Sequence, residues 1–142
     1  MSNISKKLVN AIEMAKHVAS FSLDPWKKVG CVGLSTRGTI LATGKNHAGA
    51  ISASSQFWKD REARRPFMIH SELDMLYNLH HTGKIHELYS VVITLFPCVH
   101  CMTALAAHKV CELYFLEIYD KDKPAIAVAE FYGIQLNQIR EH

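Results

Sequence analysis

The sequence predicts a single α/β domain in which helices cover a mixed β-sheet. Three observations lead to this prediction. Hydrophobic residues make up 49% of the 142 residues, which is enough for a substantial core. A hairpin pattern occupies the first third of the chain, and helical patterns alternate with short buried strands in the rest. Because no linker, repeat or change of composition divides the sequence, we expect residues 1–142 to form one domain.

The first third is expected to hold one helix and one hairpin. Apolar residues recur at helical spacing over residues 4–20, with charged residues between them. Two runs of strand character follow, at 29–34 and 39–43. The residues between them, 36–38, are typical of a hairpin turn, so the two strands should pair antiparallel.

The middle of the chain is less regular. The segment 46–69 has no clear periodicity, and a loop of this length is uncommon in a compact domain unless it has a function. We expect part of it, about 55–65, to be helical. A regular helix should follow over 73–82 and end at Gly83.

The last third alternates strands with helices. Residues 88–95 and 113–118 are short apolar runs and are expected to be buried strands. Residues 98–110 and 125–132 have helical character. Strands joined by a helix pair in parallel, whereas the hairpin is antiparallel, so the sheet should be mixed.

Charge and hydropathy narrow the class of protein. The sequence has 16 Lys and Arg against 13 Asp and Glu, a net charge of +3. This mild basic bias suits a small anionic ligand such as a nucleotide, whereas a long nucleic acid would need a basic stripe. No run approaches the roughly 20 apolar residues of a membrane helix, and the first residues lack the apolar stretch of a signal peptide. We therefore expect a cytoplasmic protein without membrane or nucleic-acid partners.

The four cysteines fall into two groups. Cys31 and Cys111 sit in apolar runs and are expected to be buried free thiols. Cys98 and Cys101 are three residues apart at the start of a predicted helix, so both sulfurs can face one metal ion. The helix dipole there favours the thiolate form that binds metal. Taken alone, the pair is compatible with metal binding, redox chemistry or simple packing.

His70 supplies a third candidate ligand, shortly before a predicted helix. Two thiolates and one imidazole suit Zn²⁺, and three protein ligands leave its fourth position to water, which is the pattern of catalytic zinc. Glu72 follows two residues later, where it can stay off the metal and move protons. The alternative is a non-catalytic zinc-binding module, which would need a fourth protein ligand.

Together these residues form the pattern H-x-E followed by P-C-x-x-C, which is typical of zinc-dependent nucleobase deaminases. The P-C-x-x-C pattern lies in the string Thr-Leu-Phe-Pro-Cys-Val-His-Cys at 94–101. With this string, the chain resembles the cytidine/deoxycytidylate deaminase superfamily, and most closely the deoxycytidylate (dCMP) deaminases. Stretches at 24–32, 42–46 and 119–124 support the same branch.

The resemblance implies a fold, a cofactor and a reaction. The fold would be a three-layer α/β/α sandwich with a five-stranded mixed sheet, as in cytidine deaminases. One catalytic Zn²⁺ per subunit would be held by His70, Cys98 and Cys101, with Glu72 as the catalytic proton carrier. The implied reaction is the hydrolytic deamination of dCMP to dUMP with release of ammonia, in pyrimidine metabolism. Alternatives are deamination of dCTP or a 5-substituted dCMP, which includes a bifunctional enzyme, of free cytidine, or of adenosine in tRNA.

Eight residues are expected to contact the substrate. The resemblance implies that Asn46 binds the sugar hydroxyl and that the backbone around Ser71, Phe96 and Pro97 reads the pyrimidine edge. A 5′-phosphate also needs basic or hydroxyl groups, which the chain offers near these positions. The candidates for that role are Lys45, Arg61, Arg65 and Tyr119, which complete the eight. The neighbouring Arg64 is a further basic residue considered for the phosphate.

The sequence departs from the family pattern at a few points. Ser71 stands where the family usually has alanine, a change small enough for the site to survive. Lys45 replaces an aromatic residue. The residues after Asn46 lack the proline common in the regulatory loop, so control by dCTP and dTTP, known in many relatives, is not implied. Because 47–69 contains no cysteine, one zinc is expected. Relatives are commonly hexamers, so we expect a homo-oligomer.

Overall fold

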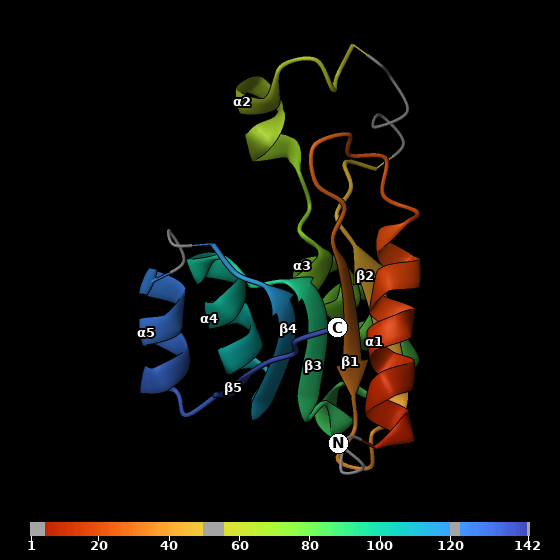
Figure 1. Ribbon diagram of the computed structural model, residues 1–142, viewed down its shortest axis with the longest axis vertical. Helices are drawn as coiled ribbons and strands as arrows, with labels where there is room; N and C mark the ends of the chain where they lie inside the picture. Colours follow the sequence, from red (N-terminus) through yellow and green to blue (C-terminus); the bar gives the residue numbers. More distant parts are fainter. Residues whose placement is uncertain (1–4, 50–55, 120–122, 142) are drawn as a thin grey trace.

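The computed structural model describes residues 5–49, 56–119 and 123–141, and these form a three-layer α/β/α sandwich (Figure 1). Within these ranges no helix has the length and apolar character that crossing a bilayer requires. The elements in chain order are α1 Lys6–Ala19, β1 Gly30–Leu34, β2 Ile40–Lys45, α2 Arg61–Arg64, the 3₁₀ helix η2 Arg65–Phe67, α3 Ser71–Thr82, the 3₁₀ helix η3 Ile85–Glu87, β3 Ser90–Leu95, α4 Val99–Ala107, β4 Glu112–Glu117, α5 Lys123–Phe131 and β5 Gln135–Gln138.

The five strands form one mixed sheet in the order β2-β1-β3-β4-β5. β1 pairs antiparallel with β2 and β3, whereas β3, β4 and β5 run parallel. The hairpin produces the antiparallel part, and the crossovers through α4 and α5 produce the parallel part. This confirms the predicted mixed sheet. The residue pattern alone does not predict β5, because 135–138 contains a single apolar residue and lies at the sheet edge.

Helices cover both faces of the sheet. Val32 and Val92 point toward α1, whereas the alternate residues Cys31, Val91 and Ile93 belong to the core under α3, α4 and α5. All five side chains are buried. A central strand covered on both faces is expected to be a continuous apolar run, which is why 88–95 could be recognised as buried.

Gly44 lets α3 approach the sheet closely. A Cβ atom at this position would lie 2.3 Å from both the Ser71 carbonyl oxygen and the Met75 nitrogen. These are backbone atoms of α3, so they cannot move aside without moving the helix. Because α3 begins at Ser71, this contact on β2 also fixes where the preceding His70 and the following Glu72 lie.

The variant Gly44→Ala is therefore expected to destabilise the fold by about 1–3 kcal/mol, the usual cost of overpacking. Urea denaturation of the variant and the parent protein measures this difference. Thr39→Ala, at an exposed position just before the same strand, serves as the control and should change stability by less than about 0.5 kcal/mol. Equal stability of Gly44→Ala and the parent protein would contradict the close approach.

Two expectations from the sequence need correction. The helix expected at about 55–65 is a four-residue helix, α2, followed by η2, and residues 50–55 lie outside the described part of the chain. Cys31 is buried as predicted, but Cys111 is exposed. It lies directly before β4, in the segment that connects α4 to this strand. The apolar run of the sequence suggested burial there, which the fold does not provide.

Candidate active site

Two candidate ligands occupy the N-cap positions of two helices. His70 precedes α3 with an extended backbone (φ −72°, ψ 153°), and Cys98 precedes α4 in the same way (φ −70°, ψ 170°). An N-cap side chain commonly accepts a hydrogen bond from the first turn. Among the described residues, neither of these side chains makes such a bond. Both are therefore available for another partner.

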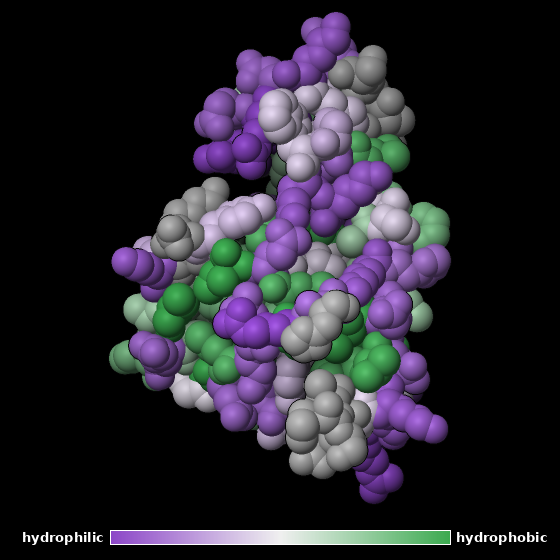
Figure 2. All heavy atoms as spheres, in the orientation of Figure 1, coloured by the Kyte–Doolittle hydropathy of each residue, from purple (hydrophilic) through white to green (hydrophobic). Residues whose placement is uncertain are grey.

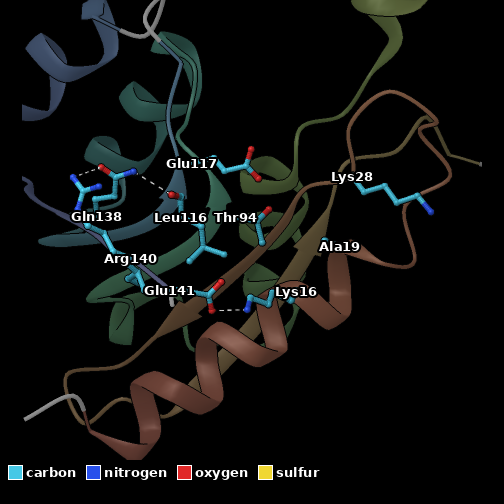
Figure 3. A pocket seen from close by; sticks show the side chains of 10 residues that line it. Lys16, Ala19, Lys28, Thr94, Leu116, Glu117, Gln138, Arg140 and Glu141 are labelled. Carbon is cyan, nitrogen blue, oxygen red and sulfur yellow. Dashed lines mark hydrogen bonds and ion pairs between the residues drawn. The ribbon is translucent and has the colours of Figure 1, made fainter. Parts of the chain in front are cut away.

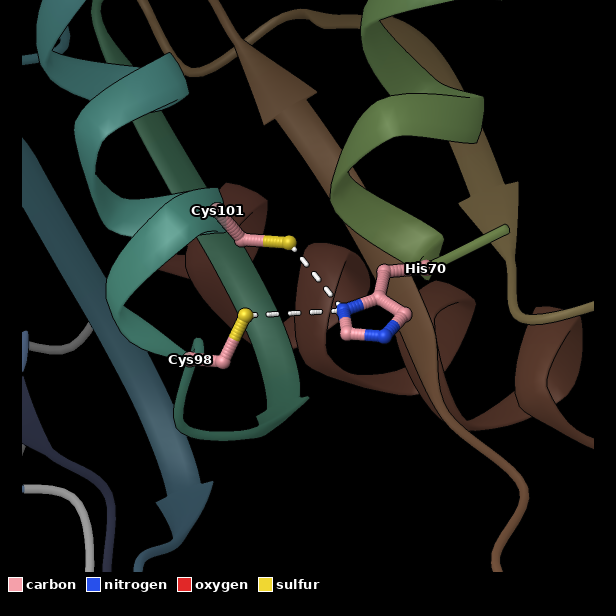
Figure 4. A group of neighbouring side chains, drawn as sticks. All are labelled: His70, Cys98 and Cys101. Carbon is pink, nitrogen blue, oxygen red and sulfur yellow. Dashed lines mark hydrogen bonds between the residues drawn. The ribbon is translucent and has the colours of Figure 1, made fainter. Parts of the chain in front are cut away.

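The imidazole and the two thiols meet between α3 and α4 (Figure 4). His70 Nδ1 lies 3.2 Å from Cys101 Sγ and 3.6 Å from Cys98 Sγ. The three ligand atoms all lie within 4.8 Å of one another. One nitrogen and two sulfurs at such spacing are a suitable donor set for Zn²⁺. The structure thus brings together the three residues that the sequence predicts as ligands.

The two cysteines differ in protonation. A hydrogen bond from the Cys101 thiol lowers the pKa of Cys98 to about 3, and the same bond raises the pKa of Cys101. Hydrogen bonding to Cys98 also raises the pKa of His70 above its ordinary value. Without metal, the site therefore holds one thiolate and one thiol. A metal that binds both sulfurs must displace the remaining thiol proton.

Glu72 lies on the first turn of α3, two residues after His70, and only 4% of it is exposed. Its carboxylate accepts a hydrogen bond from the Ser71 hydroxyl (3.0 Å). Burial raises the pKa of Glu72 above its usual range. A carboxyl group with a raised pKa holds a proton more readily than an exposed one, which suits it to acid–base chemistry.

A cavity of about 470 Å³ opens beside these four residues. His70, Glu72 and Cys98 contribute to its wall, together with residues from α2, from the loop before β1 and from the end of β3. The space-filling view shows hydrophilic side chains over α2, and a notch between α2 and the body of the molecule (Figure 2). The volume lies within the range of ordinary small-molecule sites.

Six of the eight predicted substrate contacts line this cavity, and two do not. The lining residues are Asn46, Arg61, Arg65, Ser71, Phe96 and Tyr119. Of the described residues, Lys45 and Pro97 are not part of the lining. The Lys45 backbone N–H donates to Asp74 Oδ2 (3.0 Å), and the Pro97 side chain is fully buried.

Asn46 is held firmly by the backbone around it. Its Oδ1 accepts from the Val29 N–H (2.8 Å), and its Nδ2 donates to the Lys27 carbonyl (2.8 Å). These bonds attach the end of β2 to the loop before β1. The side chain that the resemblance assigns to a sugar hydroxyl therefore also shapes the cavity wall.

Sequence reasoning missed the pairing of Arg64 with Asp24. The two Arg64 terminal nitrogens donate to the two Asp24 oxygens, each at 3.0 Å, and both side chains are buried. The sequence placed Arg64 among the candidates for a substrate phosphate. Its charge is instead neutralised by an internal partner 40 residues away.

A second cavity, of about 530 Å³, is lined by Lys16 and Ala19 of α1 together with residues of β3, β4 and β5 (Figure 3). An ion pair between Lys16 of α1 and Glu141 spans part of it. His70, Cys98 and Cys101 are not among its lining residues. It therefore offers none of the ligand chemistry of the first cavity.

Several solved structures share this fold. The chain is similar to dCMP deaminase from the cyanophage S-TIM5 in apo form, with a TM-score of 0.72, 20% identity, and coverage of 92% of this chain and 95% of that one. The same enzyme in complex with dCMP and dUMP gives a TM-score of 0.71 and 19% identity, with coverage of 95% and 98%. At these identities the likeness shows a shared fold.

The sequence itself shows the family. Residues 2–117 match the sequence model of the "Cytidine and deoxycytidylate deaminase zinc-binding region". This chain belongs to the cytidine and deoxycytidylate deaminase family. A "Probable deoxycytidylate deaminase" of Caenorhabditis elegans is 30% identical over 120 residues, which cover 82% of this chain and 60% of the relative. The chain thus spans less than two thirds of that relative's length.

Proposed function

We propose that this protein catalyses the zinc-dependent hydrolytic deamination of dCMP to dUMP, with release of ammonia. The observation that carries the proposal is that His70, Cys98 and the buried Glu72 line one cavity, with the Cys101 thiol within 4.8 Å of the other two ligand atoms. The family supplies the reaction class, and similarity to dCMP deaminases supports dCMP as the substrate.

The residues present fit one zinc ion. His70, Cys98 and Cys101 offer one nitrogen and two sulfurs, and two of them are N-cap residues whose side chains turn toward this point. A zinc ion held there would activate water for attack on the base and polarise the site. The chain's own contribution is to fix the three ligands at the starts of two helices, α3 and α4. Close packing against Gly44 of β2 holds α3 in place.

Glu72 is the proposed proton carrier. Its carboxylate would accept a proton from the attacking water and deliver it to the ring nitrogen and then to the departing amino group. Burial favours the protonated form of Glu72, which helps the delivery steps, and the Ser71 hydroxyl holds one carboxylate oxygen in place. Only 4% of Glu72 is exposed, which shields the carried proton from exchange with bulk solvent.

Charge around the cavity supports a phosphorylated substrate. Lys27 is bound to Glu117 (2.8 Å), and Arg64 is bound to Asp24. Arg61 and Arg65 are the remaining arginines of the wall. The partner of Arg65 is Glu62, an exposed acid of α2, and such an exposed ion pair is weak. The two guanidinium groups are therefore the proposed contacts of the 5′-phosphate.

A substrate panel tests the proposal. We expect the zinc-loaded protein to release one ammonia per dUMP formed, with the highest kcat/KM for dCMP among dCMP, dCTP, 5-methyl-dCMP, deoxycytidine, cytidine and tRNA. A preference for dCTP or 5-methyl-dCMP would keep the chemistry and change the substrate. Reaction with tRNA alone, or with no member of the panel, would refute the proposal. Light scattering of the same preparation tests the expected homo-oligomer.

A further inference from the structure

Resting on the proposed function, a further role can be assigned to the buried pair of Asp24 and Arg64. We infer that this pair is a positioning anchor, which holds α2 against the body of the protein and thereby sets where Arg61 and Arg65 meet the substrate's anionic group. Neither member of the pair needs to touch the substrate for this role.

The first support is the position of α2. It is a four-residue helix beyond the sheet, at the same end of the molecule as the loop that follows α1 (Figure 1). Four residues make too short a helix to be stable by itself, so tertiary contacts must hold it. The bidentate bond from Arg64 to Asp24 is such a contact, with side-chain exposures of 4% and 9%.

The second support is the environment of Arg64. Its guanidinium group lies 4.7 Å from the ring centroid of Trp58, and its buried Nε has no hydrogen-bond partner within the described part of the chain. Burying a charged group costs desolvation free energy, which the bidentate pairing with Asp24 offsets. The paired ends of the guanidinium, and not the Nε, therefore determine how the residue is oriented.

The third support is what Asp24 holds. Its Oδ1 also accepts from the Trp26 N–H (2.8 Å), which shapes the turn before β1. The guanidinium group of Arg61 in turn lies over the Trp26 ring, 5.7 Å from the centroid of that ring. Arg61 and Arg64 are three residues apart on α2 and so share one face. Two arginines of α2 thus contact the same turn: Arg64 pairs with the buried Asp24, and Arg61 lies over the exposed Trp26.

A consequence for specificity follows. Arg61 and Arg65 flank Arg64 in α2 and η2, and both line the cavity. If the anchor is released, these two cations lose their fixed positions while the zinc ligands, on α3 and α4, keep theirs. Loss of the anchor should therefore weaken binding of the phosphorylated substrate without disturbing the chemistry of the base.

The test uses variants that separate the effect of losing the Arg64–Asp24 pair on substrate binding from its effect on the stability of the fold. Arg64→Met keeps an unbranched stem beside Trp58 but leaves Asp24 buried and unpaired, so its Tm should fall by about 10 °C. The double variant Asp24→Asn/Arg64→Met removes both charges and retains an oxygen for the Trp26 N–H, so most of that loss should be recovered. Arg37→Met, at the exposed hairpin turn, is the matched control.

In the zinc-loaded double variant, KM for dCMP should rise about 10- to 100-fold, the usual effect of losing a charge-assisted contact. The value of kcat for dCMP and of kcat/KM for deoxycytidine, which has no phosphate, should stay within about threefold of the parent. Arg64→Lys should recover only part of the loss, because one ammonium group cannot bind both oxygens. Unchanged KM for dCMP, or an equal loss with deoxycytidine, would overturn the inference.

Hydrogen exchange tests the anchor without catalysis. The Arg64 and Met68 amides bond within this segment, to Asp60 and Arg65 carbonyls. In the double variant their exchange should accelerate at least about tenfold, and in Arg37→Met it should not change. If the parent protein deaminates no cytosine nucleotide, the proposed function fails, yet this measurement still decides the anchor. Unchanged exchange in the double variant would refute it.

Discussion

Replacing Glu72 by glutamine is expected to lower kcat for dCMP by about 10²- to 10⁴-fold, the range attributed to a lost general acid–base group. Glutamine has nearly the same shape as glutamate, so the buried site should stay filled. Its amide oxygen can still accept the hydrogen bond from the Ser71 hydroxyl. What the variant loses is the capacity to take up and hand on a proton.

Two measurements make this result specific. Zinc content should remain at one ion per chain, because Glu72 is not part of the ligand group. Glu130→Gln, an exposed position on α5, is the matched control and should keep full activity. If Glu72→Gln binds zinc and retains more than about a tenth of the parent kcat, the assignment of the proton carrier is wrong.

The second large effect is expected from the metal. Removal of zinc with a chelator should abolish turnover, and added Zn²⁺ should restore it in the parent protein. In Cys98→Ser, a hydroxyl replaces one of two thiolates, so zinc binding should weaken strongly and activity should be lost. Elemental analysis beside the activity assay measures both quantities in the same sample.

Cys111→Ser is the matched control for this variant. Cys111 is exposed and lies outside the ligand group, so its replacement should leave both zinc content and activity unchanged. A Cys98→Ser protein that keeps one zinc and full activity would contradict the ligand set. So would a parent protein that remains fully active after complete removal of the metal.

The protonation of Cys101 gives this metal site a pH dependence. Hydrogen bonding to Cys98 raises the pKa of Cys101, so this thiol keeps its proton in the metal-free protein at neutral pH. Zinc binding must release that proton, and the apparent affinity for zinc therefore increases with pH and falls as the solution becomes more acidic. Calorimetry in buffers of different ionisation enthalpy counts the protons released.

Most of the secondary structure follows from local patterns. The helix at 73–82 and the strand at 88–95 are predicted by periodicity and apolar runs, and α3 and β3 agree with them. The helix expected at about 55–65 is only the four-residue α2, and the edge strand β5 is not predicted, because neither element has an apolar face of its own. Such elements exist through contacts with the rest of the fold, which a local pattern does not contain.

The candidate site divides in the same way. The chemistry of its ligands and the three-residue spacing of the cysteines can be read directly, since one helical turn brings such positions to one face. Their meeting with His70 depends on a contact across 31 residues of chain. The sequence also could not show which of the clustered arginines is neutralised inside the protein.

By itself the sequence determined which groups are available: one imidazole, two thiols and one carboxyl group in an order that the deaminase family shares. Only the tertiary structure decided that Glu72 is buried, that Cys111 is not, and that Arg64 is paired with Asp24. The physical reason is that spacing along the chain fixes neighbours within one turn or strand. Burial and charge pairing depend on which distant surfaces exclude water together.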